Sequence, residues 1–168
     1  MSMSTVFEQL QQLLDAGAAR YRVMEHAAEG KSDEVARIRG TLPSQGAKAM
    51  MCKPKDAKPG EGPWWLAVLP GDQKLDFRQL AAAVGAKKVT LASPEEAMQV
   101  TGCVMGSVPP FALSPQVTLV VDPGLVERHD EIAFNAGRLD RSMVLNAQDY
   151  VRITQPLLHA LCTAAPII

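Results

Sequence analysis

Residues 46–69 read GAKAMMCKPKDAKPGEGPWWLAVL, and this stretch carries two strand signals. Residues 47–53 and 64–69 are predicted to be strands, because both runs are short, rich in apolar residues and bounded by glycine or proline. The segment between them, 54–63, holds three prolines and two glycines, which is typical of a connecting loop. We expect the two strands to pair through a hairpin-type connection that is somewhat long.

Helix and strand signals alternate irregularly outside this hairpin. Helices are expected after the capping residues Thr5, Ser32, Asp76, Ser93 and Asn146. Further short strands are expected at 21–26, 89–92, 117–121, 131–135 and 142–145. The last two are closely spaced, with a turn predicted at Asn135–Arg138, which suggests antiparallel pairing. We therefore predict an α+β fold: one domain over residues 1–168, with a mixed, largely antiparallel sheet and surrounding helices.

Length and composition indicate a globular chain with a balanced charge. The chain has 168 residues, of which 47% are hydrophobic, which suits a single sizeable core. Its 17 Lys and Arg residues are offset by 18 Asp and Glu residues, so the formal net charge is −1. A general DNA or RNA binder usually carries a clear basic excess. We expect no DNA partner and only a local contact with RNA.

Cysteine and histidine usage argues against a metal site or a disulfide framework. Cys52, Cys103 and Cys162 are far apart and form no CxxC pair, and the three histidines match no metal motif. The chain shows no signal-peptide pattern and no run of about 18 apolar residues. We expect a cytoplasmic protein that uses no metal or cofactor and does not engage a membrane.

Lys48, in the strand predicted at 47–53, is the first candidate for chemistry. Side chains alternate between the two faces of a strand, so Lys48 shares a face with Met50 and Cys52. A lysine in this setting could offer its ammonium group to a phosphate or a carboxylate. The alternative is a strand lysine that lies along the surface with its ammonium group in solvent.

The segment TGCVMGSVPPF at 101–111 is the second candidate. Glycine lets the backbone approach a ligand closely and adopt positive φ, and the two prolines stiffen the end of the segment. Such a loop can present fixed amides to an oxyanion, or fixed carbonyls to an ammonium group or a hydroxyl, and Ser107 adds a side-chain hydroxyl. The alternative is purely structural, a helix end followed by a tight turn.

Single polar and aromatic residues give weaker signals. His26 could orient a substrate or relay a proton, although a surface histidine fits as well, and Asn135 could supply a polar pocket wall. Trp64 and Trp65 are adjacent in a predicted strand, so one should face the core. The other could stack on a nucleobase or pack in the core or a subunit contact. No spacing supports a serine–histidine–aspartate triad.

Four segments together resemble the YbaK and prolyl-tRNA-synthetase-associated editing-domain family, and in particular its freestanding YeaK-like branch. They are RVMEHAAEGKSDEVARIRG, GAKAMMCK, TGCVMGSVPPF and DEIAFNAGRLDRS, and the resemblance extends over about residues 20–155. It implies a mixed sheet with helices packed around it. It also implies hydrolysis of the ester bond that joins an amino acid to tRNA.

The resemblance implies catalytic roles for three residues. Lys48 matches the family's functional lysine, which is expected near the phosphate of the terminal adenosine. Gly102 and Gly106 match the loop glycines whose backbone holds the aminoacyl group and the attacking water.

Four further residues are implied to contact substrate: His26, Ser107, Pro109 and Asn135. Ser107 and Pro109 belong to the glycine loop, as does Pro110, and His26 matches a histidine of the closer branch that is expected in the pocket wall. Asn135 stands where many members have serine, which leaves the amino-acid preference open.

The implied reaction needs little chemical machinery. An aminoacyl ester is already activated, so positioned water and a stabilised oxyanion suffice, with help from the tRNA's own ribose hydroxyl as the family implies. We expect trans-editing of tRNA that carries a small amino acid, serine or threonine first and alanine next. The partner is the acceptor end of tRNA with its amino acid; the oligomeric state stays open. The alternative is a non-catalytic module on the same fold that binds aminoacyl-tRNA or a small ligand.

Overall fold

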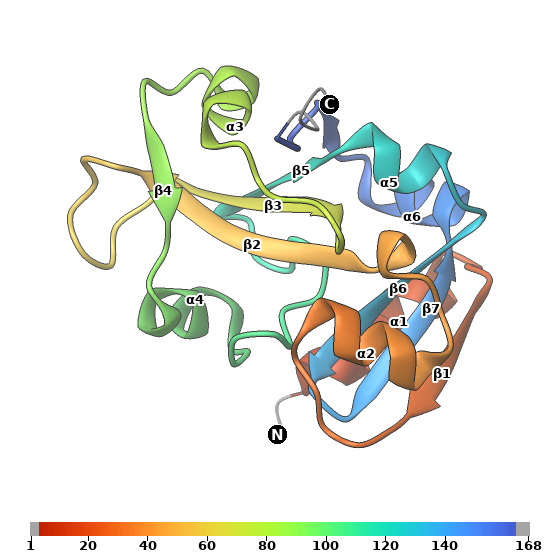
Figure 1. Cartoon of the computed structure of the whole chain (residues 1–168). Coiled ribbons are helices and arrows are strands. Elements are labelled where there is room, and N and C mark those ends of the chain that lie inside the picture. Colours follow the sequence, from red (N-terminus) through yellow and green to blue (C-terminus); the bar gives the residue numbers. More distant parts are fainter. Residues whose placement is uncertain (1–3, 164–168) are drawn as a thin grey trace.

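The structure is a computed structural model that describes residues 4–163, so both ends of the expected domain lie outside the described residues. Figure 1 shows two sheets lying side by side with helices around them. The helices are α1 (Val6–Ala16), α2 (Ser32–Arg39), a short 3-10 helix η1 (Pro43–Gln45), α3 (Phe77–Val84), α4 (Pro94–Thr101), α5 (Pro123–Glu127) and α6 (Ala147–Thr154). Across residues 4–163, none of the helices has the length and apolar character needed to cross a membrane.

The strands divide between a five-stranded and a three-stranded sheet. They are β1 (Tyr21–Glu25), β2 (Ala47–Pro54), β3 (Trp64–Pro70), β4 (Val89–Leu91), β5 (Val117–Val121), β6 (Glu131–Arg138), β7 (Arg141–Asn146) and β8 (Leu157–Leu158). The larger sheet has the order β4-β2-β3-β5-β8, in which β2 runs antiparallel to its neighbours and β3, β5 and β8 run parallel. The smaller is β1-β7-β6, antiparallel throughout. The predicted α+β fold with mixed, largely antiparallel pairing is confirmed, but in two sheets.

Capping residues define most helix starts as the sequence predicted. The Thr5 hydroxyl accepts from the backbone N–H of Glu8 at 3.1 Å, and α1 then buries Phe7, Leu10 and Leu14. In α4 the capping box is reciprocal: the Ser93 hydroxyl accepts from the Glu96 N–H at 3.1 Å, and the Glu96 carboxylate accepts from the Ser93 N–H at 2.9 Å. Each cap satisfies amide groups that the first helical turn leaves free.

The predicted cap of the second helix was wrong. Ser32 is the first residue of α2, and its side chain caps nothing; the N-cap is Lys31. The Glu29 carboxylate instead accepts from the N–H groups of Gly30 and Lys31 at 3.2 and 3.0 Å. A carboxylate just upstream of the helix therefore fixes the chain that leads into it.

The predicted turn at Asn135–Arg138 was also wrong, because β6 continues through Arg138 and the turn lies at Leu139 and Asp140. The register of β6 on β7 shifts between Asn135 and Arg138, which is a β-bulge. Gly137 has φ +79°, and its N–H donates to Ser107 O at 3.0 Å. The glycine therefore marks a bulge that lets a strand contact the 101–111 segment.

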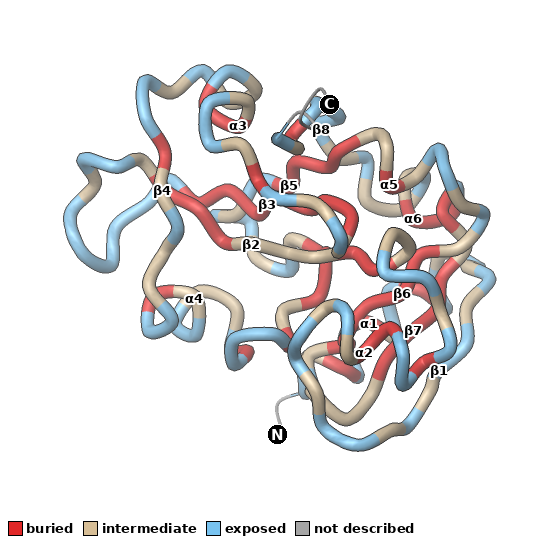
Figure 2. Tube along the Cα trace, viewed as in Figure 1, coloured by how far each residue is buried: buried red, intermediate tan, exposed pale blue. Residues whose placement is uncertain are grey.

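Trp64 and Trp65 are both buried, with 5% and 8% of their surface exposed. Strand β3 is central, and Figure 2 shows it buried along its length. Trp64 belongs to the larger core, together with Phe111 and Phe134, whereas Trp65 packs in a second core on the other face of the sheet. The interpretation of an outward tryptophan that stacks on a nucleobase was therefore wrong.

Candidate functional site

A small cavity of about 70 Å³ lies where the two sheets meet. An isolated parallel bridge between Gly46 and Ala133 brings β2 against β6 at this point. Strand β4 pairs only with residues 52–54 of β2, so residues 47–50 have no partner strand on that edge. The cavity occupies the space beside this open edge. Apolar side chains form most of its wall: Val35, Ala47, Ala49, Val108, Ala133 and Phe134.

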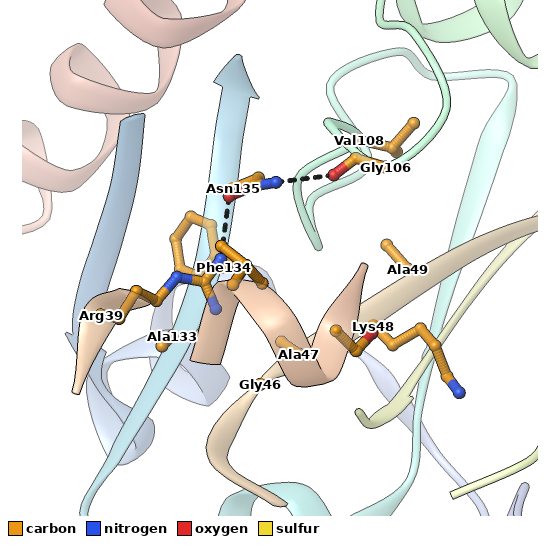
Figure 3. A pocket seen from close by; sticks show the side chains of 12 residues that line it. Arg39, Gly46, Ala47, Lys48, Ala49, Gly106, Val108, Ala133, Phe134 and Asn135 are labelled. Carbon is orange, nitrogen blue, oxygen red and sulfur yellow. Dashed lines mark hydrogen bonds between the residues drawn. The ribbon is translucent and has the colours of Figure 1, made fainter. Parts of the chain in front are cut away.

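Asn135 is the polar centre of this cavity. Its amide nitrogen donates to the carbonyls of Glu29 and Gly106, both at 2.9 Å. Its amide oxygen accepts from Arg39 Nη2 at 2.9 Å (Figure 3). The same oxygen accepts from the Ser142 hydroxyl at 3.1 Å. A buried amide with both ends bonded is held in one orientation. Asn135 therefore links α2, strands β6 and β7, and two loops at one point.

Ser142 and His26 extend the network behind the cavity. The Ser142 hydroxyl, fully buried, accepts from Arg39 Nε at 2.7 Å and lies 2.7 Å from His26 Nε2. His26 Nδ1 lies 2.8 Å from the Ala27 carbonyl, which can only accept, so Nδ1 carries a proton. The Ser142 hydroxyl donates to Asn135 Oδ1 and also lies within hydrogen-bond distance of His26 Nε2. His26 does not line the cavity itself, in contrast to the pocket-wall position that the sequence suggested.

Arg39 is a buried cation without a carboxylate partner. The residue is 7% exposed and lines the cavity, and no ion pair among residues 4–163 includes it. Burial lowers the pKa of its guanidinium to about 10, which still leaves it charged at neutral pH. Among residues 4–163, its side chain donates hydrogen bonds to two neutral oxygens, those of Ser142 and Asn135.

Two glycines in the 101–111 segment are required for different reasons. Gly102 has φ +73° and ends α4 through an N–H bond to Met98 O at 2.7 Å, with nothing within 4 Å of a Cβ placed there. Gly106 has φ +87°, and a Cβ at this position would lie 2.9 Å from the Cα of Gly30. Gly106 therefore allows two backbone segments to touch beside the cavity.

The rest of this loop is anchored to the core. Asn135 holds the Gly106 carbonyl, Gly137 N–H holds the Ser107 carbonyl, and the Tyr150 hydroxyl donates to Pro110 O at 2.7 Å. The Ser107 side chain is fully buried and donates to Val104 O at 2.7 Å, so it stabilises the loop itself.

The exposed tip of the loop leaves backbone donors available. Within the described part of the chain, the N–H groups of Met105 and Gly106 have no acceptor. Two adjacent free amides at a fixed turn can bind an oxyanion.

A second cavity of about 290 Å³ adjoins the small one and shares Lys48, Ala49, Gly106 and Val108 with it. Its other walls are mostly apolar and come from β4, α4 and the loop: Leu91, Ala92, Pro94, Ala97 and Met105. Gly102 and Pro109 line neither of these two cavities; they line a third one, of about 340 Å³. The geometry is that of a small, partly polar pocket that opens into a larger apolar groove.

Residues 26–153 match the family model of the aminoacyl-tRNA editing domain. The chain belongs to this family. A multifunctional Ser/Thr-tRNA deacylase, ProXp-y, of Escherichia coli strain K12 is 48% identical over 155 residues, which cover 92% of each chain. The protein of the same name from Escherichia coli O157:H7 matches to the same extent.

Solved structures have the same fold at lower identity. One protein described as hypothetical superposes with a TM-score of 0.82 at 23% identity, covering 93% of this chain and 100% of its own. A candidate trans-editing enzyme for prolyl-tRNA synthetase gives a TM-score of 0.78 at 21% identity, covering 97% and 100%. The family match over residues 26–153 and the 48% identical relatives confirm the family resemblance found in the sequence, and the solved structures confirm the fold.

In this editing domain the Lys48 side chain points away from the small cavity. Lys48 is among the residues that line both cavities, but its side chain extends away from Asn135 and Gly106 (Figure 3). Its ammonium group donates to Gln73 O. Partial burial lowers the pKa of Lys48, although Cys162 and Asp72 oppose the shift. The predicted alternation of faces along β2 is confirmed, since Cys52 and Met50 pack in the second core.

The site of this editing domain contains two residues that the sequence analysis missed, Arg39 and Ser142. Arg39 follows Val35 at the four-residue spacing of one helix face, and that spacing was the available signal. An arginine in the last turn of a helix is usually taken as an exposed residue that interacts with the helix end. In the part of the chain that the structure covers, no group of His, Cys, Asp and Glu could hold a metal ion.

Proposed function

We propose that this protein is a trans-acting deacylase that hydrolyses the ester of tRNA mischarged with serine or threonine. The observation that carries the proposal is the small cavity, which is lined by Arg39 and Asn135 together with apolar side chains. Membership of the editing-domain family and 48% identity to a Ser/Thr-tRNA deacylase give the reaction class.

The cavity volume supports a small amino acid. A water molecule takes up roughly 10–15 Å³ of such a cavity. A cavity of about 70 Å³ therefore holds only a few non-hydrogen atoms. Serine, threonine and alanine side chains fit this limit, whereas aromatic and long aliphatic side chains exceed it. Rejection of larger substrates by size needs no further device.

The loop supports hydrolysis by water. In the proposed reaction, water attacks the ester carbonyl carbon, the bond from that carbon to the ribose oxygen breaks, and a proton passes to the ribose oxygen. We propose that the N–H groups of Met105 and Gly106, which have no acceptor among residues 4–163, stabilise the negative oxygen that forms. One such donor is typically worth about 10²–10³ in turnover. The bond from Asn135 to Gly106 O keeps these amides in place.

The second cavity provides room for the terminal adenosine of the tRNA. It adjoins the small cavity along Lys48, Ala49, Gly106 and Val108, so an ester would lie at the junction, beside the loop amides. Lys48 is proposed to contact the terminal phosphate after its ammonium group leaves Gln73 O, because a four-carbon side chain is long and flexible. Since charged tRNA is the substrate, we place the activity in the cytoplasm.

A panel of charged tRNAs tests this proposal. The protein is incubated with tRNAs charged with serine, threonine, alanine, cysteine and proline, and the loss of ester is followed against a protein-free sample. We expect acceleration for serine and threonine above the rest. If no ester is lost faster than in the protein-free sample, the alternative of a non-catalytic binding module on this fold replaces the deacylase.

A further inference from the structure

We propose that Arg39 determines which amino acid is hydrolysed, by donating a hydrogen bond from its free guanidinium nitrogen to the side-chain hydroxyl of serine or threonine. The inference rests on the proposed deacylase function and adds the recognition chemistry of the same cavity. In this role Arg39 selects the amino acid and takes no part in breaking the ester bond.

Two of the three guanidinium nitrogens of Arg39 are already fixed. Nε donates to Ser142 Oγ at 2.7 Å, and Nη2 donates to Asn135 Oδ1 at 2.9 Å. These two bonds set the plane of the guanidinium group. The third nitrogen, Nη1, has no acceptor among the residues that the structure describes. Because Arg39 is buried and lines the small cavity, Nη1 is available to the contents of that cavity.

A buried guanidinium group with unused N–H donors destabilises the folded protein, so a substrate that supplies an acceptor would bind favourably beside it. Removing a guanidinium group from water is unfavourable unless its N–H groups find acceptors. The acceptors around Arg39 are a hydroxyl and an amide oxygen, and both are neutral. A further acceptor oxygen brought by the substrate would give the third nitrogen, Nη1, a partner. Among small amino acids, the hydroxyls of serine and threonine supply one.

The apolar walls account for the pairing of serine with threonine. Val35, Ala47 and Ala49 line the cavity together with Arg39, so a methyl group can contact hydrocarbon while the adjacent hydroxyl bonds the guanidinium. Alanine would enter the same space but leave Nη1 without an acceptor. Sites built to bond a substrate hydroxyl discriminate strongly against analogues that lack it.

The test compares one tRNA charged in turn with serine, threonine, alanine and aspartate. For the wild-type protein we expect kcat/KM for serine to exceed that for alanine by at least about 10-fold. In Arg39→Met the ratio should fall to within about threefold of unity. Arg37→Met is the matched control, because Arg37 lies on the same helix, is exposed and pairs with Glu34. It should leave the ratio unchanged.

Other outcomes distinguish selection by Arg39 from the deacylase function itself. An active Arg39→Met protein that keeps the wild-type serine-to-alanine ratio would overturn the inference and leave the deacylase function standing. Preference of the wild type for aspartate would overturn it too, since the cation would then select a carboxylate. If Arg39→Met does not fold by circular dichroism, Arg39→Gln provides the same comparison. A wild type that hydrolyses none of the four esters contradicts the proposed function itself.

Discussion

The side-chain amide of Asn135 on strand β6 donates a 2.9 Å hydrogen bond to the backbone carbonyl of Gly106 in the glycine-proline loop. The same nitrogen donates to the Glu29 carbonyl just before α2. One buried side chain therefore ties together two loops that lie far apart in the sequence. The free amides of the loop and the guanidinium group of Arg39 both depend on this residue for their positions.

Replacing Asn135 by alanine should damage stability and activity together. The substitution leaves the Gly106 and Glu29 carbonyls and Arg39 Nη2 without their partner, and an unsatisfied buried group costs about 1–3 kcal/mol. We expect Tm to fall by several degrees and kcat/KM for seryl-tRNA to fall by at least about tenfold. Gln116→Ala, at an exposed turn before β5, is the control and should change neither quantity.

Alanine substitutions at three glycines should distinguish the cost of a strained backbone from a role in the site. Gly85, Gly102 and Gly106 all have positive φ, which costs a residue with a side chain about 1–2 kcal/mol. A Cβ meets nothing at Gly85 or Gly102, but it collides with Gly30 at position 106. We expect similar losses of stability for Gly85→Ala and Gly102→Ala with activity largely retained, and a loss of at least about tenfold in kcat for Gly106→Ala. Equal activity in all three variants would remove Gly106 from the site.

Lys48→Ala tests whether the ammonium group reaches the tRNA. If it contacts a phosphate, turnover should fall sharply, and the slope of log KM against log salt concentration should decrease by about 0.7. The fold should persist, because the side chain only bonds Gln73 O. Lys87→Ala, in the exposed connection between α3 and β4, is the control for general charge loss. Unchanged turnover and salt dependence would exclude Lys48 from the mechanism.

The buried pair of Lys53 and Glu96 should make stability depend on pH below neutrality. Lys53 Nζ lies 2.6 Å from Glu96 Oε2, and the Gly60 N–H donates to the same oxygen at 2.8 Å. The hydrogen bond from Lys53, followed by those from the backbone of Ser93 and Gly60, lowers the pKa of Glu96 to about 2. The folded-state pKa therefore lies below the unfolded one, about 4.3, so this stabilisation is complete above about pH 5 and declines as the pH falls toward 2.

Glu96→Gln provides the measurement for that pair. The variant cannot titrate at this position, so the difference in Tm between it and the wild type should be largest near pH 7 and should shrink as the pH is lowered to 3. Glu95→Gln, one residue away and exposed, serves as the control. A difference in Tm that does not change over this range would contradict the assignment.

Local signals in the sequence predicted most of the secondary structure. The caps at Thr5, Asp76, Ser93 and Asn146 act within three or four residues, and each of them lies where it was predicted. Helix α5, the 3-10 helix η1 and the two-residue strand β8 were missed. These elements are five residues long or shorter, so they carry no recognisable period and depend on tertiary contacts.

The site was predictable only in part, because it depends on long-range contacts. Gly106 and Asn135 were selected from the sequence and do line the small cavity. Lys48 lies on β2 as predicted, but the direction of its ammonium group follows from Gln73, 25 residues away. Arg39 and Asn135 are separated by 96 residues, and nothing in the local sequence near Arg39 indicates an amide partner. The local sequence around Gly137 predicts a turn where the structure has a bulge, because glycine at positive φ is typical of both.

Multiple-turnover hydrolysis of seryl-tRNA tests the central claim most directly. Purified protein at a small fraction of the tRNA concentration is mixed with seryl-tRNA, and the remaining ester is measured over time against a protein-free sample. We predict that each protein molecule releases many serines, and that Gly106→Ala at the same concentration is slower by at least about tenfold. Ester loss at the protein-free rate, or protection of the ester in proportion to the protein added, would contradict the account and identify a binding module.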